Sequence, residues 1–205
     1  MTGSGPDRVG TGLDNAVDAA DVAVGGSTAG IVDERVMPWA RIDWIACGVI
    51  VLATVVLVGL HIRTYTTLSP TDELQHLDYV IKAGEFDPPN RNEFVGQEAL
   101  AEAACRSVDV FGYIGPQCGL EVHDPENFQE RGVNTAASQF PPYYTVTGLL
   151  SRALTDTGIL ESSVTAARLV GALWTGAAGC VMWYLMSLFG IARSRRAVAI
   201  VAFMA

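Results

Sequence analysis

The chain has 205 residues, half of them hydrophobic, and yet its formal net charge is −9. These properties are compatible because the charges are segregated: of the 22 acidic side chains, seven lie in residues 1–43 and fifteen in residues 62–165. The acidic balance and the single lysine, Lys82, leave no basic stripe for a phosphate backbone, which argues against nucleic acid as a partner.

The N-terminal segment has the composition of a disordered chain. Residues 1–36 are rich in Gly, Ala, Asp, Ser and Thr and contain no aromatic residue. Such a segment cannot bury enough apolar surface to offset the entropy lost on ordering. We therefore expect residues 1–43 to form a disordered tail.

The first apolar run predicts a transmembrane helix over residues 44–62. Its central stretch, Trp44 to Leu60, contains no charged residue. As a helix this stretch covers about 25 Å, and the next two residues bring it close to the roughly 30 Å of a bilayer core. Trp39 and Trp44 at its start and Tyr65 past its end suit the two interfaces.

A short acidic helix is expected directly after this span. The sequence reads Pro70-Thr-Asp72-Glu73-Leu-Gln-His76, and Ser69 or Thr71 is the expected N-cap. On a helix, Asp72 and His76 share a face and Glu73 lies on a neighbouring one. The plain interpretation is that both acidic residues only complement the helix dipole.

The position of this acidic helix suggests a chemical role as well. Carboxylates one short turn outside a bilayer can serve a reaction on a lipid-anchored substrate. Either Asp72 or Glu73 can act there as a general base on a sugar hydroxyl, or hold a divalent cation against a phosphate leaving group. Which of the two applies, and whether a metal is used at all, stays open.

Residues 63–168 read as an insert that is rich in loops, with one short helix at Glu93 to Cys105. Cys105 and Cys118 lie thirteen positions apart in it. In an oxidising compartment they would form a disulfide that contributes about 3 kcal/mol by the loop-entropy model. Two free thiols are the alternative.

A second amphipathic helix is expected near the end of the insert. The segment Pro141-Pro142-Tyr143-Tyr144 forms a turn into this helix, with the tyrosines at headgroup depth. Arg168 directly precedes the next apolar run, where it can snorkel outward or pair with a carboxylate or a phosphate.

That run predicts a second transmembrane helix over residues 169–191, with small residues on the face that packs on another helix. These small residues are Gly171, Ala172, Gly176, Ala177, Gly179 and Cys180.

The residues after the second span predict the orientation of the chain. The short loop 192–196 holds Arg193, Arg195 and Arg196, a basic cluster that the positive-inside rule places in the cytoplasm. The N-terminus is then cytoplasmic and residues 63–168 are extracytoplasmic. Residues 197–205 are apolar, and we expect them to begin a third span of a longer, multi-pass chain.

The order of these features resembles the N-terminal part of glycosyltransferase-C-type (GT-C) membrane enzymes. It is most similar to a bacterial family of multi-pass proteins with a Pro-x-Asp-Glu-x-x-His motif after the first span. A second family motif, Pro-Pro-Leu-Tyr-Tyr, is matched at 141–144 without its leucine, and an Arg-Leu pair opens the next span at Arg168. The resemblance covers residues 44–205.

The resemblance implies an all-α membrane protein of the bacterial cell envelope, located in the plasma membrane. It also implies transfer of a sugar from a polyprenyl-phosphate donor to an extracytoplasmic acceptor. Asp72 would be the base or metal ligand, with Glu73 and His76 beside it, and Tyr143, Tyr144 and Arg168 would bind substrate. Further spans would complete the lipid-donor pocket, so residues 1–205 alone are expected to be inactive.

A non-catalytic function is the alternative. In that interpretation the chain is a membrane protein whose disulfide-closed outer domain binds a partner or supports an envelope complex. Asp72 and Glu73 would then contribute only to stability.

Overall fold

The computed structural model describes residues 40–108, 110–112 and 114–204. Within these ranges all regular secondary structure is helical, which confirms the all-α class, and β-type pairing is limited to two isolated bridges. In chain order the helices are α1 (Arg41–Thr64), α2 (Glu73–Gly84), α3 (Gln97–Arg106), the 3₁₀ turns η1 (Pro125–Asn127), η2 (Gln129–Gly132) and η3 (Thr135–Ser138), then α4 (Pro141–Asp156), α5 (Ser163–Leu188) and α6 (Arg193–Met204).

The predicted tail falls almost entirely outside the described residues. Only its last four residues, 40–43, are described, and three of them already belong to α1. The predicted disorder of residues 1–39 stays a prediction.

Helices α1 and α5 are each long and apolar enough to cross a membrane. They have 24 and 26 residues, which correspond to about 36 and 39 Å of helix. Only 17% of the most apolar window of α1 and 28% of that of α5 is buried. A core helix of a soluble protein would bury most of this surface, so the exposure favours contact with lipid or with further helices.

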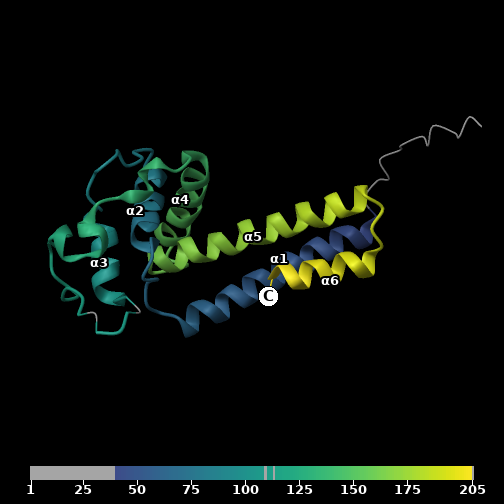
Figure 1. Cartoon of the computed structure of the whole chain (residues 1–205), viewed down its shortest axis with the longest axis horizontal. Helices are drawn as coiled ribbons and strands as arrows, with labels where there is room; N and C mark the ends of the chain where they lie inside the picture. Colours follow the sequence, from purple (N-terminus) through teal and green to yellow (C-terminus); the bar gives the residue numbers. More distant parts are fainter. Residues whose placement is uncertain (1–39, 109, 113, 205) are drawn as a thin grey trace, which may run out of the picture. The chain divides into compact units, whose positions relative to one another are not determined.

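Close contact between α1 and α5 depends on two glycines of α5, and Figure 1 shows the two helices side by side. A Cβ added at Gly176 would lie 3.1 Å from the Cα of Val51, and one at Gly179 would lie 2.8 Å from Cγ2 of Ile50. The predicted small-residue face is therefore present at Gly176 and Gly179. Ala177, which the sequence places on the same face, is exposed instead.

Helix α5 begins earlier than the apolar run indicates. Ser162 caps it by accepting a hydrogen bond from the N–H of Thr165, so a polar first turn precedes the apolar residues. Arg168 consequently lies within the helix and not in front of it. Hydropathy alone cannot detect a helical turn that is polar and capped.

The basic residues after α5 belong to a helix, whereas a loop was expected at 192–196. Helix α6 includes the arginines and continues through the apolar residues up to Met204. Helix α6 lies beside α1 in Figure 1 and packs against α1 and α5 in one cluster. Ile50, Trp183 and Ile200 are buried in this cluster. The described end of the chain is therefore a short helix packed on the other two.

In the insert, α2 and α4 cross with their backbones in contact. A Cβ at Gly148 would lie 2.6 Å from the backbone N of Gly84 and would collide with the carbonyl oxygen of Val80. Glycine is needed at this crossing because no side-chain atom fits there. The contact places the start of α4 beside the start of α2.

The expected helix at Glu93 to Cys105 begins later, at Gln97. The preceding residues are extended, because the N–H of Val95 donates to the carbonyl of Gly132 and the N–H of Asn134 donates to that of Glu93, both at 2.8 Å. This bridge between segments far apart in the chain replaces the first turn that the local sequence suggests.

Two apolar clusters fill the insert. The larger one joins α2, α3 and the start of α5 through Leu68, Leu74, Leu77, Val95, Ala99, Leu100, Ala103, Val108, Phe128 and Val164. The smaller one joins α2 and α4 and consists of Tyr79, Val80, Ala83, Ala136 and Tyr144. Both clusters fix α2, which carries the acidic motif.

Candidate functional site

The acidic motif lies where the chain passes from α1 into α2. Helix α2 begins at Glu73, and Asp72 occupies the N-cap position without a side-chain capping bond. The expected cap by Ser69 or Thr71 is wrong, because their hydroxyls bond each other at 2.9 Å. Instead the N–H of Ser69 donates to the carboxylate of Glu73 at 2.6 Å, so the acidic side chain itself holds the loop to the helix.

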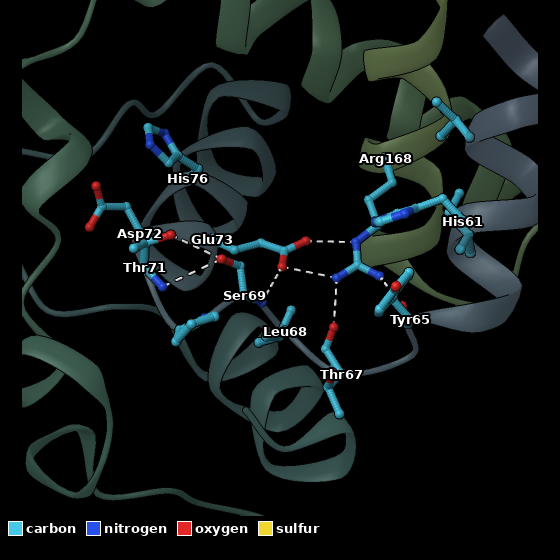
Figure 2. A pocket seen from close by; sticks show the side chains of 13 residues that line it. His61, Tyr65, Thr67, Leu68, Ser69, Thr71, Asp72, Glu73, His76 and Arg168 are labelled. Atoms are coloured by element: carbon cyan, nitrogen blue, oxygen red, sulfur yellow. Dashed lines mark hydrogen bonds and ion pairs between the residues drawn. The ribbon is translucent and has the colours of Figure 1, made fainter. Parts of the chain in front are cut away.

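Glu73 and Arg168 form a two-point ion pair between α2 and α5. Nε of Arg168 lies 2.6 Å from one carboxylate oxygen, and a terminal nitrogen lies 2.9 Å from the other. The side chains are 24% and 16% exposed. Figure 2 shows the carboxylate and the guanidinium facing each other, joined by these bonds. Paired donors on a planar guanidinium give this interaction both strength and a fixed orientation.

Arg168 also binds the loop that follows α1. Its terminal nitrogens donate to the carbonyl oxygens of Tyr65 at 2.8 Å and Thr67 at 2.7 Å (Figure 2). With the bonds to Glu73, four of its donor contacts go to the protein, and a guanidinium has five N–H groups. Arg168 thus holds together the end of α1, the start of α2 and α5, and has little capacity left for a phosphate.

The environment of Glu73 keeps its carboxylate charged. Burial by itself raises the pKa of Glu73, but the hydrogen bonds from Arg168 and from the N–H of Ser69 outweigh this and hold the pKa below its ordinary value. A carboxylate held in this way is a poor proton acceptor. Glu73 therefore suits a structural role more than general-base catalysis.

Asp72 differs from its neighbour in its exposure and in its contacts. Its side chain is exposed, and within the described part of the chain its carboxylate forms no hydrogen bond or ion pair. Figure 2 shows its carboxylate pointing away from Arg168, on the same side of the pocket as His76. Of the two acidic residues, only Asp72 has a carboxylate available to a ligand.

His76 is held by Tyr144 of α4. Its Nδ1 lies 2.6 Å from the phenolic oxygen of Tyr144, and the two rings are parallel within 3°. Tyr144 in turn stacks on Tyr79, with 3.9 Å between the ring centroids. The helix crossing thus brings together residues from the two predicted motifs.

Tyr143 lies beside this stack and is half exposed. Its ring packs edge-on against Tyr144 at 5.1 Å and lies 5.8 Å from the ring of Trp174 on α5. The indole N–H of Trp174 donates to the hydroxyl of Thr147 at 3.0 Å. Aromatic faces fixed in this way offer a stacking surface for an apolar or sugar-like ring.

Two cavities adjoin at the ion pair, and Glu73, His76 and Arg168 line both. The cavity nearer α1 has a volume of about 610 Å³ and also includes Val58, His61, Ile62, Tyr65, Thr67, Leu68, Ser69, Pro70, Thr71 and Asp72. The cavity nearer α4 has a volume of about 350 Å³ and also includes Leu77, Val80, Tyr143, Tyr144, Thr147, Val164, Ala167 and Gly171. All six residues predicted for catalysis or substrate binding therefore line one cavity or both.

Cys105 and Cys118 form a disulfide. It lies at the end of α3, and neither cysteine lines the two cavities. The bridge closes a loop of the insert and takes no part in the site.

The described residues do not form a cluster of metal ligands by themselves. Among the described residues there is no group of three or more His, Cys, Asp or Glu side chains that could hold a metal ion. Divalent cations in proteins need several oxygen or nitrogen ligands.

Sequence reasoning missed two contributors to the site. Arg106 forms a second anchor: it donates to the carbonyl of Thr66 at 3.0 Å and to the hydroxyl of Ser162 at 2.7 Å. Tyr79, which supports Tyr144, has the spacing of an ordinary core residue of α2. Only Arg106, a cation in the last turn of α3, carried a local signal, and that signal points equally to a favourable interaction with the helix dipole.

No known protein family, curated protein or solved structure matches this chain.

Proposed function

We propose that the chain is the N-terminal portion of a membrane glycosyltransferase-like protein, which moves a sugar from a polyprenyl-phosphate donor to an acceptor outside the cytoplasm. One observation carries the proposal. An exposed and unpaired carboxylate, Asp72, borders a cavity that is also lined by Val58 and Ile62 of α1, a helix long enough to cross a bilayer. Such a cavity suits a substrate with an apolar chain and a polar head.

The proposed reaction assigns Asp72 as the general base. It takes the proton of an acceptor hydroxyl while the acceptor oxygen bonds to the anomeric carbon of the sugar. The bond from that carbon to the lipid phosphate breaks, and the phosphate leaves with the electron pair. Arg168 and Glu73 keep Asp72 in place by holding the loop, and Tyr143 offers a surface for a sugar ring.

The proposed orientation places the insert outside the plasma membrane and the N-terminus in the cytoplasm. The three arginines at the start of α6 support it through the positive-inside rule. The disulfide between Cys105 and Cys118 also supports it, because such bonds persist in oxidising compartments. The multi-pass character of the complete protein belongs to the same proposal.

The test compares two acidic-to-amide variants in the complete gene product. Asp72→Asn removes the proposed base, whereas Asp87→Asn changes a carboxylate that is also exposed but lines neither cavity. Membranes are supplied with labelled polyprenyl-phosphate sugars, and transfer to endogenous acceptor is measured. We expect Asp72→Asn to lose about 10²- to 10⁴-fold in rate, with both variants inserted at wild-type levels. Equal transfer by the two variants would refute the assignment.

A second candidate function is the binding of a partner by a non-catalytic protein. The loop closed by the disulfide has a feature that favours it. Phe111 and Ile114 of this loop are fully exposed, and exposed apolar groups of this size often mark contact surfaces. That function predicts that Phe111→Ser impairs the biological role while Asp72→Asn leaves it intact. The opposite result supports the transferase.

A further inference from the structure

The hydrogen bond between Tyr144 and His76 decides what His76 can offer to a ligand. We propose that Tyr144 is a positioning residue that holds His76 in the tautomer protonated at Nε2, so that His76 presents a hydrogen-bond donor, and not a base, to the two cavities. The tautomer is a property of the folded chain, and its catalytic meaning rests on the proposed function.

The single hydroxyl proton of Tyr144 determines this tautomer. The hydroxyl of Tyr144 has one hydrogen, and within the described residues Nδ1 of His76 is its only hydrogen-bond partner, at 2.6 Å. Tyr144 is 6% exposed. If Nδ1 carried the proton and donated to the phenol, the phenolic hydrogen of this largely buried side chain would have no acceptor among the described residues. Buried donors without acceptors are strongly disfavoured, so the phenol donates and Nδ1 accepts.

The surroundings keep this arrangement rigid. Tyr144 stacks on Tyr79 with the ring planes parallel within 2°, and Tyr79 is 1% exposed and donates to the carbonyl of Gln139 at 3.2 Å. Rotating Tyr144 away from His76 would require the α2–α4 contact to open. Burial and the neighbouring tyrosines also raise the pKa of Tyr144 to about 12, so the phenol keeps its proton at neutral pH.

The consequence is a division of roles between the two residues on this side of the pocket. A neutral imidazole whose Nδ1 accepts a hydrogen bond carries its only proton on Nε2. His76 therefore fits a ligand oxygen that is negatively charged or becomes so, such as a phosphate oxygen of the leaving lipid. Asp72, whose carboxylate is exposed on the cavity, is left as the proton acceptor.

Nitrogen NMR measures the tautomer directly. The complete protein is labelled with ¹⁵N-histidine in lipid nanodiscs, and the signals of His76 are those that disappear in His76→Gln. We expect Nε2 to show a one-bond coupling to hydrogen, while Nδ1 shows none and has the shift of a hydrogen-bonded acceptor. Tyr144→Phe should move the Nδ1 signal and mix the tautomers. Tyr143→Phe, which removes a hydroxyl that does not contact His76, should leave both signals in place.

A protonated Nδ1 in the wild type, or a spectrum unaffected by Tyr144→Phe, would overturn the proposal. These outcomes do not depend on catalysis. A protein with the expected spectrum whose Asp72→Asn variant transfers sugar normally would refute the proposed function and leave the tautomer established.

A pair of His76 variants tests the catalytic meaning. Glutamine offers an N–H close to the position of Nε2 but cannot act as a base, whereas leucine offers neither. If His76 donates to a charged oxygen, His76→Leu should lose about 10²- to 10³-fold in the transfer rate, and His76→Gln should recover at least a tenth of the wild-type rate. Equal loss in both variants would overturn the donor role.

Discussion

The neighbouring carboxylates of Asp72 and Glu73 end in opposite environments, although the chain presents them as a pair. Glu73 is bound at both oxygens by Arg168 and by a backbone N–H, while Asp72 stays exposed on the cavity. At the level of single residues, the site therefore contains one carboxylate that holds the structure together and one that is left available to a ligand. The two can be separated by measuring stability and activity independently.

Glu73→Gln is expected to lower the free energy of unfolding by about 1.5–3 kcal/mol, because Arg168 loses a charged partner in a partly buried position. The pKa of Glu73 is lowered in the folded state, so the wild-type stabilisation is complete above the ordinary pKa near 4.5. This stabilisation is lost as the pH falls through the lower pKa that Glu73 has in the folded state. Thermal unfolding in detergent at several pH values should show the two proteins converging in acid.

The matched control for this experiment is Glu85→Gln. Glu85 pairs with Arg152 at 3.3 Å, but these side chains are 57% and 51% exposed. Exposed pairs contribute between about 0 and 1 kcal/mol, so this variant should unfold nearly like the wild type at every pH. A loss as large as that of Glu73→Gln would contradict the structural role of the Glu73–Arg168 pair.

At the level of elements, the site exists because α2 and α4 touch through glycines. The contact of Gly148 with Gly84 and Val80 aligns Tyr144 with His76 on the facing helix. A side chain added at Gly148 could not be accommodated by a local shift, because the atoms in contact belong to the backbones of both helices and not to flexible side chains. Packing density at this crossing is therefore a condition for the hydrogen bond that sets the tautomer.

Gly148→Ala should force α2 and α4 apart and destabilise the insert by about 1–3 kcal/mol or more. Gly171→Ala is the matched control, since Gly171 is also in a helix and a Cβ there meets nothing within 4 Å. Alanine favours the helix over glycine, so the control should be neutral or slightly stabilising. Thermal unfolding of both variants measures the difference, and equal midpoints would show that the backbones are not in contact.

At the level of the whole molecule, the two ends of the α1–α5 pair hold different groups of polar side chains. The candidate site lies at the end of α1 and the start of α5, whereas Asp43 at the other end accepts a hydrogen bond from Trp183 at 3.1 Å and lies 3.5 and 3.6 Å from nitrogens of Arg193 and Arg196. Asp43 offsets part of the basic charge. The positive-inside rule counts Lys and Arg and not net charge, so the expected orientation is unchanged.

The proposed orientation predicts which positions react with a membrane-impermeant thiol reagent in intact cells. Glu121→Cys, in the insert, should react from outside, and Arg195→Cys should react only after permeabilisation. Both positions are exposed, so access to the reagent and not burial decides the outcome. Labelling of Arg195→Cys but not Glu121→Cys in intact cells would reverse the orientation.

The sequence alone was sufficient for features that depend on neighbouring residues. The apolar runs of α1 and α5, the acidic start of α2 and the proline start of α4 follow from composition and helical spacing, because burial and dipole effects act over one or two turns. Element boundaries were less accurate. The capped polar turn before Arg168 and the extended pairing at Val95 have no apolar period to mark them.

The tertiary structure decided how the predicted residues divide into roles. Arg168 lies 95 positions from Glu73 and Tyr144 lies 68 from His76, so no local pattern could show that the first pair neutralises itself and that the second fixes a tautomer. These pairings depend on a helix crossing at which only glycine fits. The sequence by itself determined which side chains approach the site, and the packing of the helices decided which of them is left available to a ligand.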